Sequence, residues 1–481
     1  LSVHLSFSHS RVHLLWEYFS TFHHKGIGYA STLINFLVNS YYTVVLSWGV
    51  HYLFASFNSV LPWTRCDQWW NSAHCGQTNS STAKNGTNVT LPISDPVAEY
   101  WENRVLGLSA GIEQVGNIQW ELALCLLLVW TVIFLCICRG IKTSGKVMYF
   151  TVTSPYLFMI ILLIRTALLD GAKEGLRYYL QPDWSKLSDM TVWSDAGTQI
   201  FFGYALSLGG LTALGSYNTF HHNSLRDCAL FAVMSALTSL LAGCIIFATL
   251  GYMALKSNVP IELVAESGPG LAFVIYPKAL GTMPGSPFWS VCFFLMLLLL
   301  GVDSMGGMFV FQLLDYYSGS RIILIVGFLE SVVIGYVYGA RRFTQHMKCM
   351  YGFSIGWLPQ LFWCVITPVF TVVLFIFSVI VYEELSYRRA GQLIPYQFPD
   401  WSVKLGWMLA ASSVLLIPIT MFIQILTTPG NLLQRIRYLL QPRLSDDLKQ
   451  KLALCKDEDY CPETVWTSFT EPPPLDDRRS P

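Results

Sequence analysis

Long stretches of the chain contain no Asp, Glu, Lys or Arg and are long enough to cross a lipid bilayer. A transmembrane helix needs about 20 apolar residues to span about 30 Å of hydrocarbon. Because these stretches are continuously apolar and do not alternate, they favour helices over the strands of a barrel. We therefore predict an all-α fold, a polytopic transmembrane helical bundle. The candidate spans are Gly28–Phe57, Leu122–Cys138, Val147–Ile164, Ala196–Leu225, Cys228–Leu255, Ala279–Val302, Ile322–Leu329 extended past Glu330 by Ser331–Ala340, Cys349–Tyr382 and Leu405–Gln434.

The loops between spans set the predicted orientation, because short basic loops lie on the inner side of a membrane. The basic loops are Arg139–Lys146, His221–Arg226 and Arg341–Lys348. The long loop at residues 58–120 must then lie outside. The predicted transmembrane domain covers residues 26–434. It follows an atypical N-terminal segment (1–25) and precedes a polar cytoplasmic tail (435–481).

The outer loop carries features of an extracellular segment. It contains three glycosylation sequons, which begin at Asn79, Asn85 and Asn88. It also contains Cys66 and Cys75, whose spacing suits a small disulfide loop in an oxidising compartment. Two free thiols are the alternative.

The predicted crossings conflict at one point. The span Ala279–Val302 runs from outside to inside, and the next span, which ends at Arg341, must also end inside. Only Asp303–Met308 separates them, which is too short for a loop and a further helix. Either a crossing is absent here or the region forms a re-entrant or fused element. We interpret it as an absent segment.

Composition agrees with a membrane protein. Hydrophobic residues make up 53% of the chain and charged residues 12%, whereas soluble domains have about 25% charged residues. The mean hydropathy is +0.46. A formal net charge of zero gives no indication of a nucleic-acid partner. Phosphate-binding loops, zinc-ligand spacings and hydrolase nucleophile motifs are absent from the sequence, so no enzyme is predicted.

One apolar span is rich in small residues. The segment Gly203–Gly215 holds four Gly together with Ser and Thr. Broken transmembrane helices expose backbone carbonyls to ions and substrates near the membrane midplane. Close helix packing through small residues explains the same composition, so both interpretations stay open.

Two acidic residues are candidates for ion chemistry. Asp303 ends an apolar stretch and is followed by Ser304, and intramembrane carboxylates are costly and usually functional. Carboxylate and hydroxyl oxygens suit a hard cation; an ordinary interfacial Asp is the alternative. Asp315 lies among polar and aromatic residues and is predicted to face an aqueous vestibule. Glu330 lies within a span and has no assigned role.

Apolar and aromatic pairs suggest a solute pocket. Val38 and Tyr42 have i,i+4 spacing and share one helix face, and Phe202 and Ala205 have i,i+3 spacing. Such pairs can line a pocket for a small organic solute, with a phenol as hydrogen-bond donor. Helix packing is the alternative.

Six motifs make the chain similar to a known family. They are Trp120–Leu128, Thr143–Val147, Asp195–Phe202, Ala213–Asn218, Ala265–Phe273 and Phe311–Tyr317. The chain resembles the sodium- and chloride-dependent neurotransmitter symporter family, most closely its GABA, taurine, creatine and betaine branch. The resemblance runs from about Gly26 to about Pro442.

The resemblance implies a plasma-membrane inverted-repeat transporter that couples sodium and chloride to uptake of a small zwitterion. Against that pattern the chain begins at the third helix and lacks the first two helices, the end of the eighth and the ninth. The pattern stops at Asp303 and Ser304 and resumes at Gly306–Met308, where the crossings conflict. The alternative function is a non-transporting truncated isoform or an incomplete gene model. Such a form would bind a full-length transporter as a homo- or hetero-oligomer.

The resemblance also implies roles for individual residues. Leu300 through its carbonyl, Asp303 and Ser304 match one sodium site. Gly203 and Ser235 stand at the other sodium site, where the family has Ser or Thr and Asn. The implied chloride ligands are Gln199 and Ser239.

Further implied roles concern the solute and the gates. The implied solute pocket consists of Val38, Tyr42, Phe202, Ala205, Leu208 and Ser304. Asp315 matches the outer-gate acid and Tyr217 an inner-gate tyrosine. Cys66 and Cys75 match the outer-loop disulfide of the family.

Overall fold

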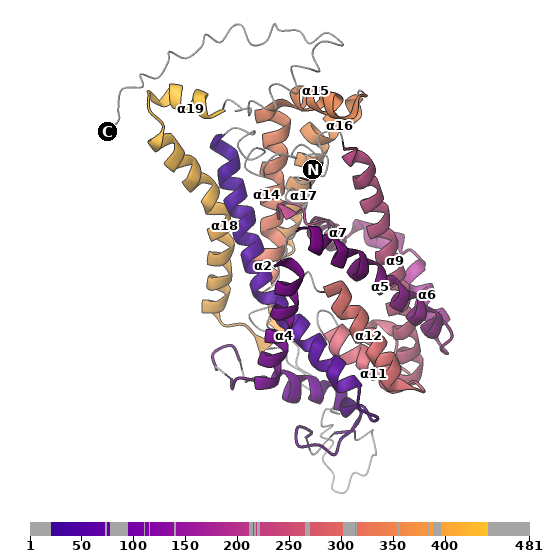
Figure 1. Cartoon of the computed structure of the whole chain (residues 1–481). Helices are drawn as coiled ribbons and strands as arrows, with labels where there is room; N and C mark the ends of the chain where they lie inside the picture. The colour runs from indigo at the N-terminus through magenta and orange to yellow at the C-terminus, as the bar shows by residue number, and fades with distance from the viewer. Residues whose placement is uncertain are drawn as a thin grey trace.

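The computed structural model describes residues 21–72, 75–76, 95–109, 111–114, 116–138, 141–210, 215, 218, 222–264, 270–301, 313, 315–353, 356–382, 384–387 and 396–440. Figure 1 shows the chain, coloured from indigo to yellow along its length. Some predicted residues lie outside the described ones: Asn79, Asn85, Asn88, Tyr217, Asp303, Ser304 and the side chain of Tyr42.

Helices dominate the described structure, as predicted. Six helical segments there are long and apolar enough to cross a membrane. They are formed by α2 (Thr21–Ser56), α5 (Ile141–Ala167), α9 (Ser224–Ser257), η6–α14–η7–α15 (Asp315–Ser320, Arg321–Val332, Val333–Gly339, Ala340–Tyr351), α16–η8–α17 (Trp357–Leu361, Phe362–Ile366, Thr367–Ile380) and α18 (Asp400–Thr427). Shorter apolar helices are α4 (Trp120–Ile137), η5–α11 (Leu271–Ile275, Tyr276–Gly281) and α12 (Ser286–Gly301).

The remaining elements are short and mostly connect these helices. They are η2 (Pro62–Thr64), α3 (Pro96–Glu99), η3 (Tyr100–Leu106), α6 (Ala172–Leu180), η4 (Trp184–Ser188), α7 (Met190–Gly203), α10 (Ile261–Val264), β1 (Ser386–Tyr387), β2 (Tyr396–Gln397) and α19 (Leu432–Leu440). The strands pair antiparallel, with Ser386 opposite Gln397, between α17 and α18.

Three predicted spans are divided in the structure; Ala196–Leu225, whose first helix ends at Gly203, is described with the candidate site below. The stretch Ala279–Val302 contains the end of α11 and all of α12, because Pro284 and the left-handed Gly285 (φ +74°) interrupt the helix. The stretch Cys349–Tyr382 is also divided, since α15 ends at Tyr351 before the left-handed Gly352. Continuous hydrophobicity therefore overestimated the helix lengths at these three places.

The basic helix α15 and the disulfide loop lie at opposite ends of the bundle (Figure 1). Helix α15, which carries Arg341 and Arg342, lies together with α19 at one end in Figure 1. The segment that follows α2, which holds Cys66 and Cys75, lies at the opposite end. The structure therefore separates α15 from the disulfide loop, and which end faces the outside of a cell stays a prediction. We call the end with the disulfide loop the outer end.

A cluster of buried aromatic side chains joins α2, η3, η5 and α12 near the outer end. Trp101 and Phe273 stack in parallel with ring centroids 4.8 Å apart, and Trp48 packs edge-on against both. The Tyr52 hydroxyl donates a hydrogen bond to the carbonyl of Phe273 (2.9 Å). Such aromatic pairs add stability beyond their buried area. We call these residues (Trp48, Tyr52, Trp101, Phe273 and Phe294) the outer aromatic cluster.

A second apolar cluster lies where α2, α7, α14, α17 and α18 meet. Its fully buried centre includes Ile34, Ile323, Leu324 and Val326. This cluster surrounds the point at which α7 ends, and it therefore positions the candidate site.

Candidate functional site

Helix α7 leads into the candidate site from the outer side. The Asp189 carboxylate caps it by accepting the Thr191 backbone N–H at 2.9 Å. Hydrogen bonds from the Thr191 side chain and backbone hold the pKa of Asp189 below its usual value. The beginning of α7 is thus fixed by its own sequence.

The chain unwinds directly after Gly203. Ala205 (φ +49°), Ser207 (φ +66°) and Gly209 (φ +74°) all adopt the left-handed conformation, which residues with a Cβ rarely occupy. The helix is therefore interrupted after Gly203, as the first of the two interpretations of the glycine-rich span predicts. Binding of an ion by its carbonyls stays a prediction. We call residues Tyr204–Gly209 the unwound segment.

Helix α2 holds the unwound segment in place. The Ser31 hydroxyl donates to the carbonyl of Ser207 at 2.7 Å, and the Asn35 amide donates to the carbonyl of Leu208. Both carbonyls would otherwise lack partners, because the unwound segment makes no regular helical ladder. Sequence reasoning missed Ser31 and Asn35. Their i,i+4 spacing, which places them on one face of an apolar helix, was the available signal.

The structure gathers most of the predicted solute pocket at this point. Val38 and Leu208 are buried, and Phe202 and Ala205 pack against the same apolar cluster. Tyr42 follows Val38 by one helical turn on α2. Four of the six residues implied by the resemblance therefore belong to or pack against one apolar cluster. Their role in binding a solute stays a prediction.

The residues implied in the first sodium site and the chloride site lie on α7 and on α9. Gln199 and Gly203 have i,i+4 spacing on α7, as do Ser235 and Ser239 on α9. Beside Gly203, the Tyr204 hydroxyl donates to the carbonyl of Ala232 on α9 at 3.4 Å. A Cβ at Gly203 would meet no atom within 4 Å.

The implied second sodium site is not assembled in the described structure. Leu300 is half-exposed near the end of α12, a helix that packs on α2 and α5. Its implied companions Asp303 and Ser304 lie outside the described residues. This site therefore stays a prediction.

The region of the implied outer gate contains an unexpected arginine. Asp315 opens the π-helical η6, which ends next to Arg321. The Arg321 guanidinium donates to the Tyr316 hydroxyl (3.0 Å) and to the Ser378 carbonyl (3.3 Å). It also lies over the rings of Tyr316 and Tyr382, at 4.4 and 5.0 Å from their centroids. Cation–π contacts of this kind fix the orientation of an arginine side chain.

The outer loop contains the predicted disulfide. Cys66 and Cys75 are bonded, with Cα atoms 5.6 Å apart. The buried Glu99 carboxylate holds this loop by accepting the Ser72 backbone N–H at 3.0 Å and the Asn71 side-chain amide at 3.1 Å. Sequence reasoning did not single out Glu99.

Comparisons with known proteins cover most of the chain. The model of the sodium:neurotransmitter symporter family matches residues 6–306 and 304–428, so the similarity starts before Gly26. The bovine (Bos taurus) sodium- and chloride-dependent taurine transporter is 43% identical over 467 residues, covering 87% of this chain and 74% of that protein. The human taurine transporter is also 43% identical, covering 87% of this chain and 75% of that protein. The mouse sodium- and chloride-dependent GABA transporter 2 is 42% identical, covering 92% of this chain and 80% of that protein.

Proposed function

Because the chain belongs to the sodium:neurotransmitter symporter family, we propose that it carries a small zwitterion across the plasma membrane. Sodium and chloride would move with the solute, as the names of the taurine and GABA transporters state for those proteins. The observation that supports this proposal most strongly is the unwound segment. It places backbone carbonyls and apolar side chains together between α2 and α7.

The solute would lie against the end of α7. Val38, Phe202 and Leu208 offer apolar surface for the methylene groups of an amino acid of the taurine or GABA type. Tyr42 would donate its phenol hydrogen to the acidic group of the solute. Ser31 and Asn35 would keep the unwound segment preorganised, which lowers the entropic cost of binding.

The ions would bind on the α9 side of the unwound segment and near α12. Gly203, Ser235, Leu300, Asp303 and Ser304 are the proposed sodium-site residues. Gln199 and Ser239 are the proposed chloride ligands, since a side-chain amide and a hydroxyl can both donate hydrogen bonds to an anion.

Uptake measurements test the proposal. Cells that display the chain at their surface would be given labelled taurine, GABA, creatine and betaine, with sodium or with choline and with chloride or with gluconate. We expect uptake of at least one solute that requires both ions. A surface-expressed chain without any sodium-dependent uptake would refute transport by this form.

A non-transporting form is the second candidate, and a specific observation favours it. The two family matches meet at residues 304–306. In the comparison with the bovine transporter, 87% of this 481-residue chain is aligned over 467 positions. The relative therefore has residues within the aligned region that this chain lacks. Sequencing transcripts across the Ser304–Met305 junction tests this candidate, because an additional helix there would mean that the sequence is incomplete. Co-purification with a full-length relative would test a regulatory role.

A further inference from the structure

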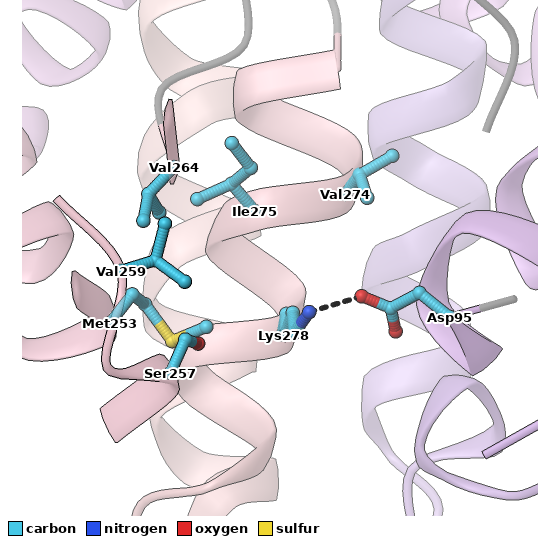
Figure 2. Close-up of a pocket in the computed structure, with 8 residues that line it drawn as sticks. All are labelled: Asp95, Met253, Ser257, Val259, Val264, Val274, Ile275 and Lys278. Atoms are coloured by element: carbon cyan, nitrogen blue, oxygen red, sulfur yellow. Dashed lines mark hydrogen bonds and ion pairs between the residues drawn. The ribbon is translucent and has the colours of Figure 1, made fainter. Parts of the chain in front are cut away.

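A cavity of about 230 Å³ lies at the outer side of the protein, away from the unwound segment. It is bounded by the start of α3, the end of α9 and the residue pair Val259 and Val264 that follows it, and by η5 and α11. Its lining residues, shown in Figure 2, are Asp95, Met253, Ser257, Val259, Val264, Val274, Ile275 and Lys278. Sites for drug-sized ligands usually occupy about 300–1,000 Å³, so this cavity fits a smaller solute.

Two opposite charges face each other in the cavity. Lys278 Nζ donates to Asp95 Oδ2, and Figure 2 shows the two side chains extending toward one another from α11 and from the start of α3. The other carboxylate oxygen, Asp95 Oδ1, accepts the Val97 backbone N–H at 3.2 Å and caps α3. One oxygen of Asp95 is therefore structural, and the other is directed at the lysine.

This charge pair selects the kind of ligand that the cavity can take. A simple cation on Asp95, or a simple anion on Lys278, would leave the other charge without a partner in a partly buried place. Such an uncompensated charge costs free energy. A zwitterion offers an ammonium group to Asp95 and an acidic group to Lys278, so both charges stay paired.

The remaining lining fits the middle of such a ligand. Met253 on α9, Val264 on α10 and Val259 in the connection between these helices provide apolar surface. Val274 and Ile275 provide it from η5. A short methylene chain between the two charged groups would contact these side chains. The Ser257 hydroxyl, at the last residue of α9, is available to the acidic group.

We propose that this cavity is a second, extracellular binding site for a small ω-amino acid, either a carboxylate or a sulfonate. The ligand would insert between Asp95 and Lys278 and replace their direct contact. Occupancy would then separate α3, which adjoins the disulfide loop, from α11, which leads into α12. The site differs from the proposed transport pocket and would act on it from outside.

Binding of GABA and taurine to the purified, glycosylated chain in sodium-free buffer tests the proposal. Ligand-induced shifts of the unfolding temperature would be titrated for the wild type, Asp95→Asn and Lys278→Met. Asn keeps the cap on α3, and Met keeps the apolar part of the lysine side chain. We expect each variant to weaken binding about ten-fold, which corresponds to about 1.4 kcal/mol.

One control variant and two singly charged ligands test whether binding depends on the Asp95–Lys278 pair. Glu121→Gln breaks another outer ion pair, with Arg104, that does not line the cavity, so wild-type affinity is expected. Butylamine and butyrate, which carry one charge each, should not compete with GABA. If both compete as well as GABA does, the charge-pair argument is wrong.

A variant of the transport pocket separates this inference from the proposed function. Phe202→Ala should leave the sodium-free binding unchanged. If Phe202→Ala removes the binding while Asp95→Asn and Lys278→Met keep it, the ligand occupies the transport pocket and the inference is overturned. Absence of sodium-free binding in the wild type would also overturn the inference, although uptake could still support the proposed function.

Discussion

The outer aromatic cluster and the unwound segment achieve order in opposite ways. In the aromatic cluster, large buried rings from α2, α12 and the π-helical η3 and η5 pack against one another, and the polar tip of Tyr52 has a hydrogen-bond partner. In the unwound segment, Ala205 and Ser207 adopt left-handed conformations, each of which costs about 1–3 kcal/mol. The Ser207 hydroxyl is buried and has no hydrogen-bond partner among the described residues. The aromatic cluster stabilises the fold. The unwound segment keeps a strained backbone and an unpaired hydroxyl at the proposed solute site.

The largest expected effect concerns the aromatic cluster. Trp101→Ala removes a ring that is 1% exposed and stacks on Phe273. Replacing a buried aromatic residue with Ala usually costs about 3–5 kcal/mol. We expect a large drop in the unfolding temperature and little mature glycosylated chain at the cell surface. Trp69→Ala is the matched control, because Trp69 is 77% exposed. Equal stability of both variants would contradict the structural role of the cluster.

A smaller effect on stability is expected at the unwound segment. Asn35→Leu leaves the carbonyl of Leu208 without its donor, and an unsatisfied buried polar group costs about 1–3 kcal/mol. The loss of solute-binding free energy should exceed the loss of unfolding free energy, because the carbonyl of Leu208 belongs to the strained segment. Asn39→Ala, on an exposed part of the same helix, controls for a general effect on α2. A binding isotherm unchanged by Asn35→Leu would argue against preorganisation.

The altered sodium ligands give a conditional prediction. Gly203→Ser fits sterically, because no atom lies within 4 Å of the added Cβ. Together with Ser235→Asn it should raise sodium affinity only in a full-length chimera that supplies the remaining ligands, since half-built sites bind weakly. Sodium titration of uptake would measure the change. If the two substitutions gave sodium-dependent uptake to this chain without the chimera, the sodium ligands of the missing helices would not be needed.

The smallest expected effect is the pH dependence of the α7 cap. The pKa of Asp189 is lower in the folded state than in the unfolded state, so its stabilising contribution is present above the ordinary carboxyl pKa. That contribution is lost as the pH falls through the lowered value. Below that pH, hydrogen exchange at the Thr191 amide should be faster in the wild type than in Asp189→Asn. The Asn side chain also caps the helix but does not titrate. Identical pH profiles would contradict this assignment.

The sequence allowed the helical bundle and the Cys66–Cys75 disulfide to be predicted, and the structure confirms both. The membrane orientation and the solute pocket stay predictions. Spans free of charge are local features of the sequence, and the disulfide joins two cysteines only nine positions apart. Helix interruptions such as that at Pro284 were overlooked because hydrophobicity alone does not register a backbone break. Ser31, Asn35 and Glu99 were missed for a different reason. Their partners lie far away along the chain, and only the tertiary structure brings them together.

The most direct test is whether the unwound segment contacts the transported solute. Ala205→Cys, in a background where the exposed Cys138 is replaced by Ser, would be modified with a membrane-impermeant thiol reagent. The rate would be measured with and without taurine or GABA. In sodium, we expect the solute to slow modification of Cys at position 205, and the protection should disappear in choline. Equal modification rates under all conditions, in a chain that reaches the cell surface, would contradict a solute site at the end of α7.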